Sequence, residues 1–132
     1  MKLNLTFVVA AAALGIAGRA VAHHSFAAEF DANSPVEVTG TVTKIEWANP
    51  HTFFYIDVQN EQGDYENWAM EMGSPNGLMR NGWTRNTMKI GDVVTVEGSM
   101  AKDGSPTGNA RTVVMTKTGQ RLFAGSSQGV TP

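Results

Sequence analysis

The sequence contains no cysteine, which excludes disulfide bonds, thiolate metal sites and cysteine nucleophiles. The stability of the folded chain must therefore come from packing. Basic side chains are also few, and they form no block or stripe of the kind that nucleic-acid-binding proteins carry. We therefore expect no nucleic-acid partner.

Long apolar runs are absent except for one near the N-terminus, at residues 5–17. Lys2 precedes this run, and the small-x-small sequence Ala20-Val21-Ala22 follows it, as in a secretory signal peptide. The run is shorter than the roughly 20 residues that a membrane-spanning helix requires. We predict a signal peptide over residues 1–22 that is cut after Ala22, and a periplasmic or secreted protein with no membrane attachment after cleavage.

Removal of 22 of the 132 residues leaves 110, which is the size of one small domain. Lys2 and Arg19 leave with the signal, so the mature chain keeps eight basic and twelve acidic side chains, a formal charge of about −4. We expect an N-terminal arm over residues 23–35, a β domain over residues 36–123, and a loose tail over residues 124–132.

Alternating apolar residues predict a mainly β domain with five principal strands. The first strand is long, and Gly40 inside it, where the apolar phase switches, predicts a bulge or a bend. The strands are expected at residues 36–47, at 52–59, at 65–72, around Val94 and Val96, and at 110–117, with a short additional strand at 121–123.

A short helix is expected between the third and fourth strands. Ser74-Pro75-Asn76 resembles an N-cap followed by proline in the first turn, and Leu78, Met79 and Trp83 can share one side of the helix. Three strands, a helix and two strands is the order of an OB-fold, a five-stranded barrel. We predict an OB-like barrel, with a small open β-sandwich as the alternative.

The three histidines are the residues most suited to metal binding. Cleavage after Ala22 would make His23 the N-terminal residue, which offers its amine and its ring nitrogen to one metal ion. His51, which follows the Asn49-Pro50 turn, could supply a third nitrogen and complete a histidine brace. Nitrogen-rich tetragonal sites favour Cu(II), so the sequence predicts copper as the metal.

Other arrangements compete with the brace. His24 could instead bind copper through the terminal amine, the intervening amide and its own ring, and this mode uses the same amine. Glu29 and Asp31 could be outer or axial ligands, or simply exposed charges on the arm. The methionines could bind Cu(I), but their positions in the strand patterns favour core packing. Alternatively, His23 and His24 could be ordinary solvated side chains, and His51 could merely cap a turn.

A second hypothesis is a module that recognises a periplasmic protein, a peptide or a glycan. Trp47 and Trp83 could form its binding surface together with the loop tips, since tryptophan combines a large apolar face with a polar N–H group. A third hypothesis is a redox enzyme that uses the same copper site. Hydrolytic catalysis is not favoured, because neither a nucleophile elbow nor an H-E-x-x-H motif is present.

Several short motifs resemble an uncharacterised family of small exported bacterial proteins, known as a domain of unknown function. The main matching segments are His23-His24-Ser25-Phe26, Glu46-Trp47-Ala48-Asn49-Pro50-His51, Asn67-Trp68-Ala69, Gly73-Ser74-Pro75-Asn76 and Gly82-Trp83-Thr84. The resemblance covers nearly all of the mature chain. It implies a periplasmic, OB-like domain and implies no activity.

Overall fold

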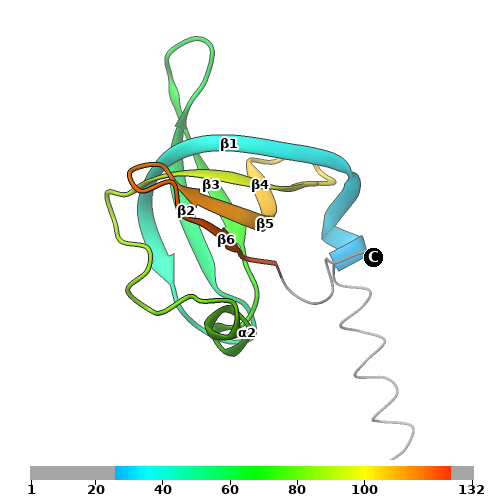
Figure 1. Cartoon of the computed structure of the whole chain (residues 1–132). Helices are drawn as coiled ribbons and strands as arrows, with labels where there is room; N and C mark the ends of the chain where they lie inside the picture. The colour runs from blue at the N-terminus through cyan, green and yellow to red at the C-terminus, as the bar shows by residue number, and fades with distance from the viewer. Residues whose placement is uncertain (1–25, 126–132) are drawn as a thin grey trace, which may run out of the picture.

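The computed structural model describes residues 26–125 of the chain. The predicted signal peptide, His23 and His24, and residues 126–132 lie outside the described residues. The described chain begins with a single helical turn at residues 26–29 and continues as a mainly β structure (Figure 1). Among residues 26–125, no helix is both long enough and apolar enough to cross a membrane.

Six strands and one short helix follow the helical turn. In chain order they are β1 (Phe30–Glu46), β2 (Phe53–Gln59), β3 (Tyr65–Glu71), α2 (Pro75–Arg80), β4 (Val93–Ala101), β5 (Thr107–Met115) and β6 (Arg121–Phe123). The helix therefore lies between β3 and β4, as the sequence predicts.

Five of the strands form a nearly closed ring. β1 pairs antiparallel with both β2 and β4, β2 pairs with β3, and β4 pairs with β5. The ring closes where β3 and β5 run parallel, with Ala69 opposite Thr107 and Glu71 opposite Asn109. This topology confirms the prediction of an OB-like barrel over the open sandwich, because a sandwich would leave β3 and β5 unpaired.

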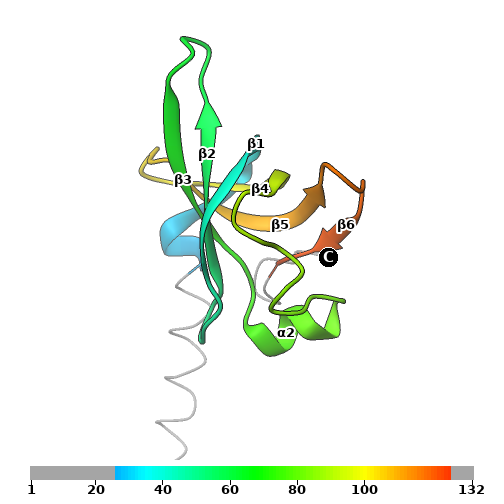
Figure 2. The same ribbon diagram turned by 90° about the vertical axis from the view of Figure 1, so that its left-hand side faces the viewer.

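The long first strand curves across the barrel, and the β2–β3 hairpin projects beyond it (Figure 1). Figure 2 shows α2 at the opposite end of the molecule from the tip of that hairpin. Because β2 begins and β3 ends on the side away from the tip, the first residues of β2 and the last residues of β3 lie together at this end.

The bend predicted within the first strand is present. The pairing of β1 with β2 shifts register between Val42 and Lys44, which is the mark of a β-bulge. Gly40 is required just before it, since a Cβ there would lie 2.5 Å from the carbonyl oxygen of Asp57. Because of the bulge, the side chains that face the core change from even-numbered positions such as Val42 to odd-numbered positions such as Ile45, as the apolar pattern indicates.

Two strands begin earlier than the sequence predicts. β1 starts at Phe30 instead of residue 36, because Phe30 and Asp31 pair with the end of β4 across an irregular stretch that lasts to Pro35. β5 starts at Thr107 instead of residue 110, because its first residues close the ring against β3. Both extensions depend on strand pairing rather than on local apolar alternation.

The barrel encloses one hydrophobic core, and four of the methionines belong to it. Trp68 and Met70 line it from β3, as the sequence indicates. Its buried members are Val42, Phe54, Ile56, Trp68, Met70, Met72, Leu78, Trp83, Met88, Val94, Val96, Ala110, Val113, Met115, Leu122 and Ala124. These methionines are packing residues and are not available as Cu(I) ligands.

The helix α2 is shorter than two full turns and lies over the lower end of the barrel. The hydroxyl of Ser74 accepts a hydrogen bond from the N–H of Gly77, and Pro75 occupies the first turn, so the predicted cap is confirmed. Leu78 faces the core, but Met79 is 51% exposed and Trp83 lies beyond the end of the helix at Arg80, so the expectation that all three share one side of the helix was wrong. Six residues are too few to bury a wide stripe.

The packed part of the chain extends past the last strand, to Ala124. Ala124 is fully buried, its N–H donates to the carbonyl of Arg111, and its own carbonyl accepts from the N–H of Gly73. The expectation that the chain is loose from residue 124 was therefore wrong at this position. The prediction relied on the small side chain of Ala124, but two backbone hydrogen bonds and complete burial hold this residue in place.

Candidate functional site

His51 lies at the end of the barrel where β2 begins. It follows the Asn49-Pro50 turn, whose peptide bond is cis. Thr52 and Phe54 point into the core, so His51 and Phe53 point to the outer face. The side chain of His51 is 27% exposed, and its Nδ1 lies 2.8 Å from Oε1 of Glu71.

Glu71 is the last residue of β3, opposite Phe53 of β2. This register places His51 two residues before the partner of Glu71, which is a diagonal position across the hairpin. The Glu71 side chain is only 12% exposed. A carboxylate in that environment requires a polar partner, and Nδ1 of His51 is the ring nitrogen in contact with it.

Burial raises the pKa of Glu71 to about 7, and the neighbouring negative charge of Glu29 adds to this rise. Glu29 belongs to the helical turn that begins the described chain, and its charge acts on Glu71.

The first described residues are fixed against the barrel near this pair. The backbone carbonyl of Glu29 accepts a 2.8 Å hydrogen bond from the N–H of Lys102, and the rings of Phe26 and Phe30 lie 5.6 Å apart. Phe30 is buried. His23 lies outside the described residues, and the three residues from it to Phe26 can span at most about 10 Å.

Asp31 is a poor candidate for a ligand. Its carboxylate accepts hydrogen bonds from the N–H of Asn33 and the hydroxyl of Ser34. These hydrogen bonds hold the pKa of Asp31 below its ordinary value and tie the side chain to the local turn. Of the two acidic residues that the sequence suggests as outer ligands, only Glu29 has an electrostatic effect on Glu71.

The two tryptophans do not form a common surface. Trp83 is 2% exposed, and its indole N–H donates to the backbone carbonyl of Phe123 at 2.9 Å. It belongs to the core and holds β6 in place, which corrects the suggestion that it could stack on a ligand. Trp47 is half-buried and packs against the core at the end of β1.

A comparison with protein families identifies the chain. Residues 11–111 match a family described as a family of unknown function (DUF6152). The chain belongs to this family. The matched region includes His23, His24, His51 and Glu71, and it confirms the resemblance that the sequence motifs indicate.

The other comparisons give less. No curated protein matches the chain. Among solved structures, the crystal structure of the ZRD-deleted mutant of TiaS in complex with agmatine is similar at 25% sequence identity, over 74% of this chain and 24% of that chain. The chain thus spans about a quarter of that protein's length, and a TM-score of 0.40 carries no argument about function.

The described part of this DUF6152 chain contains no complete metal site. Among residues 26–125, no three His, Asp or Glu side chains are grouped so that they could hold a metal ion. His51 therefore offers one ring nitrogen, and any further strong donors must come from outside the described residues. His23 and His24, the histidines of the predicted metal site that lie outside the described residues, are close to Phe26 along the chain.

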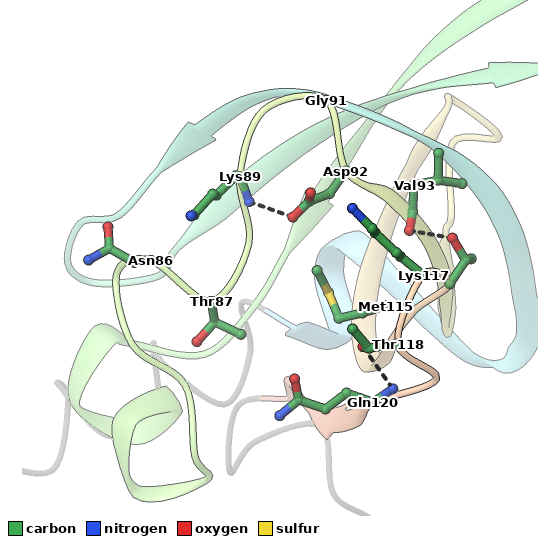
Figure 3. Close-up of a pocket in the computed structure, with 11 residues that line it drawn as sticks. Asn86, Thr87, Lys89, Gly91, Asp92, Val93, Met115, Lys117, Thr118 and Gln120 are labelled. Carbon is green, nitrogen blue, oxygen red and sulfur yellow. Dashed lines mark hydrogen bonds between the residues drawn. The ribbon is translucent and has the colours of Figure 1, made fainter.

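A separate groove of about 460 Å³ lies between the loop before β4 and the turn between β5 and β6. In Figure 3, Lys89 and Asp92 lie on the loop side and Gln120 on the turn side, and the N–H of Lys89 donates to Asp92. No feature of the sequence points to this groove. Neither His51 nor Glu71 lines it, so it is distinct from the candidate metal site.

The raised pKa of Glu71 predicts a pH-dependent stability of the metal-free protein. Folding raises this pKa from its ordinary value of 4.5 to about 7, so between these values the folded protein binds more protons than the unfolded chain. The free energy of unfolding should therefore fall as the pH rises through this interval, by on the order of 2 kcal/mol, and level off above it.

Urea denaturation at a series of pH values measures this dependence. Glu71→Gln carries no ionisable group and should lose that part of the slope. Glu66→Gln is the matched control, because Glu66 is an exposed residue of the same strand, and its slope should equal that of the wild type. Equal slopes for Glu71→Gln and the wild type would show that Glu71 ionises normally.

Proposed function

We propose that this protein is a periplasmic or secreted metal-binding protein and that copper is its metal. The site forms between the N-terminal residue His23, which supplies its amine and its ring, and the ring of His51. The observation that carries the proposal is the contact between His51 Nδ1 and Glu71, beside the place where the N-terminal segment joins the barrel.

The contact supports a metal site because it leaves a defined donor. With Nδ1 directed at a carboxylate, Nε2 is the ring nitrogen that remains for a ligand. Histidines that bind metals generally donate their other ring N–H to a carboxylate or a carbonyl. Above the pKa of Glu71, Glu29 and Glu71 also give this end of the barrel negative charge, which favours a cation over an anion.

In this proposal, the amine and the ring of His23 supply the remaining donors. The charge of Glu29 acts on Glu71, and only five residues separate Glu29 from His23 along the chain. Export with cleavage after Ala22 would give His23 a free amine. Three nitrogen donors in a T-shaped arrangement suit Cu(II) better than the other common divalent ions.

The recognition module is less well supported. It relies on Trp47, Trp83 and the loop tips, and Trp83 is in the core. Trp47 alone remains beside the loop that carries His51. A redox enzyme would use the same copper site, so copper binding has to be measured before turnover with oxygen and a reductant is tested.

A Cu(II) titration of the mature protein tests the proposal, after mass spectrometry has established that the chain begins at His23. We expect one copper ion per chain. A variant that retains Ala20 to Ala22 moves the amine away from His23 and should bind copper on the order of 100-fold more weakly, which is about 2.7 kcal/mol. Three added residues are used because one would place His24 third in the chain, where it chelates copper with the backbone.

Two results would contradict the proposal. One is the absence of copper binding by the mature protein. The other is equal affinity in the mature protein and in the variant that retains Ala20 to Ala22, which would mean that the amine is not a ligand. Zn(II) titrated in parallel serves as the comparison metal, and we expect it to bind more weakly than Cu(II).

A further inference from the structure

Glu71 is held more firmly than a surface carboxylate. Its backbone lies in the closing seam of the barrel, where it is opposite Phe53 of β2 on one side and Asn109 of β5 on the other. Its side chain is 12% exposed. The carboxylate therefore has little freedom to move away from His51, whose Nδ1 lies 2.8 Å from it.

His51 is held less firmly by its own chain. It lies in the loop between β1 and β2, just before the first residue of β2, and outside the regular pairing. Its side chain is 27% exposed. The neighbouring backbone is anchored at Thr52, which exchanges two hydrogen bonds with the chain at Met72 and Gly73, but these bonds do not orient the ring. The orientation of the ring thus depends on its contact with Glu71.

We propose that Glu71 is a positioning residue that fixes the His51 ring with its proton on Nδ1 and with Nε2 directed outward as the metal donor. This inference rests on the proposed metal site, and it adds the residue that orients one of the metal ligands. Glu71 itself does not bind the metal ion. It acts through His51, as a carboxylate acts on a metal-binding histidine in many protein sites.

The chemical reason is the choice between two neutral tautomers. A free imidazole exchanges its proton between Nδ1 and Nε2, and only the nitrogen without the proton can bind a metal ion. A carboxylate that accepts a hydrogen bond from Nδ1–H favours the tautomer with a lone pair on Nε2. It also prevents rotation of the ring, so binding costs less conformational entropy.

Two substitutions separate this role from mere packing. Glu71→Gln keeps an oxygen that can accept from Nδ1–H and removes the charge. Glu71→Leu has a similar size and removes the acceptor altogether. Glu66→Leu is the matched control, since Glu66 is an exposed residue of the same strand whose partner across the hairpin is Val58, away from His51. Thermal denaturation of each variant establishes that it is folded.

The deciding measurement is ¹⁵N NMR of the His51 ring in the metal-free protein, at a pH above the pKa of Glu71. We expect the proton on Nδ1 in the wild type, in Glu71→Gln and in Glu66→Leu, and a mixture of tautomers in Glu71→Leu. Copper affinity should fall by roughly 10- to 100-fold in Glu71→Leu and should be largely retained in Glu71→Gln.

The outcomes distinguish this inference from the proposed function. A wild-type ring with its proton on Nε2, or the same tautomer in the wild type and in folded Glu71→Leu, would overturn the positioning role even if copper binds. If the tautomers follow the expected pattern and the wild type binds no copper, the metal site is overturned and the control of the ring by Glu71 stands.

Discussion

Gly98→Ala is expected to destabilise the barrel by roughly 3 kcal/mol or more, which is the upper range for adding an atom to a packed site. A Cβ at Gly98 would lie 1.9 Å from the backbone carbonyl oxygen of Asn109, far inside contact distance. The β4–β5 pairing shifts register between Glu97 and Gly98, so the two backbones approach closely here. Asn109 also pairs with Glu71, so moving it would open the seam that closes the ring.

The free energy of unfolding from urea denaturation measures this effect. Ser99→Ala is the matched control, because it is the next residue of β4 and already has a Cβ, and its stability should lie within about 0.5 kcal/mol of the wild type. An unchanged unfolding midpoint in Gly98→Ala would mean that β4 and β5 do not approach as closely as described. If Asn109 moves, its pairing partner Glu71 moves as well. We therefore expect Gly98→Ala also to bind copper more weakly.

His51→Ala is expected to lower the affinity for Cu(II) on the order of 100-fold, equivalent to about 2.7 kcal/mol. The substitution removes one of the three nitrogen donors of the proposed brace and leaves the amine and the ring of His23. The side chain lies on the outer face of the barrel and is 27% exposed, so its removal should leave the core intact. Competition with a chromophoric chelator of known affinity measures the loss.

His24→Ala is the control that decides between the two modes of copper binding. The brace predicts that this variant keeps the affinity of the wild type. The competing mode, in which the amine, the backbone amide and the ring of His24 bind copper, predicts the reverse order of the two variants. A large loss in His24→Ala with no loss in His51→Ala would contradict the brace.

Much of the fold is predictable from the sequence because its strands are half-buried. Alternation places Phe54, Ile56 and Trp68 inside the barrel, and the Ser74-Pro75 pair marks the start of α2. The early start of β1 at Phe30 could not be predicted in this way. It is set by pairing with Ala101 at the far end of β4, which is a contact between residues distant in the sequence.

The candidate site is only partly predictable, for a related reason. His51 is identifiable because histidines are few and because it follows a turn. Glu71 is not, since a single acidic residue at the end of a strand carries no signal of its own. The hairpin register that makes Phe53 and Glu71 opposite partners could have revealed it, because the loop between β2 and β3 is short and fixes the pairing.

Trp83 shows the converse case, because the sequence suggested a ligand-binding residue and the structure places it in the core. Tryptophan is common both in cores and on ligand-binding surfaces, and local pattern does not separate these roles. The position of Trp83 depends on β6, which supplies the carbonyl of Phe123 for its indole N–H. That hydrogen bond spans 40 residues of sequence, so only the assembled barrel reveals it.

Pulsed EPR of the one-to-one Cu(II) complex of the mature protein tests the central claim most directly. The remote nitrogen of each coordinated imidazole modulates the electron spin echo, so the spectrum counts the histidine rings at the metal. The account predicts two rings in the wild type, from His23 and His51, and one ring in His51→Ala. A spectrum that is the same in the wild type and in His51→Ala would contradict it.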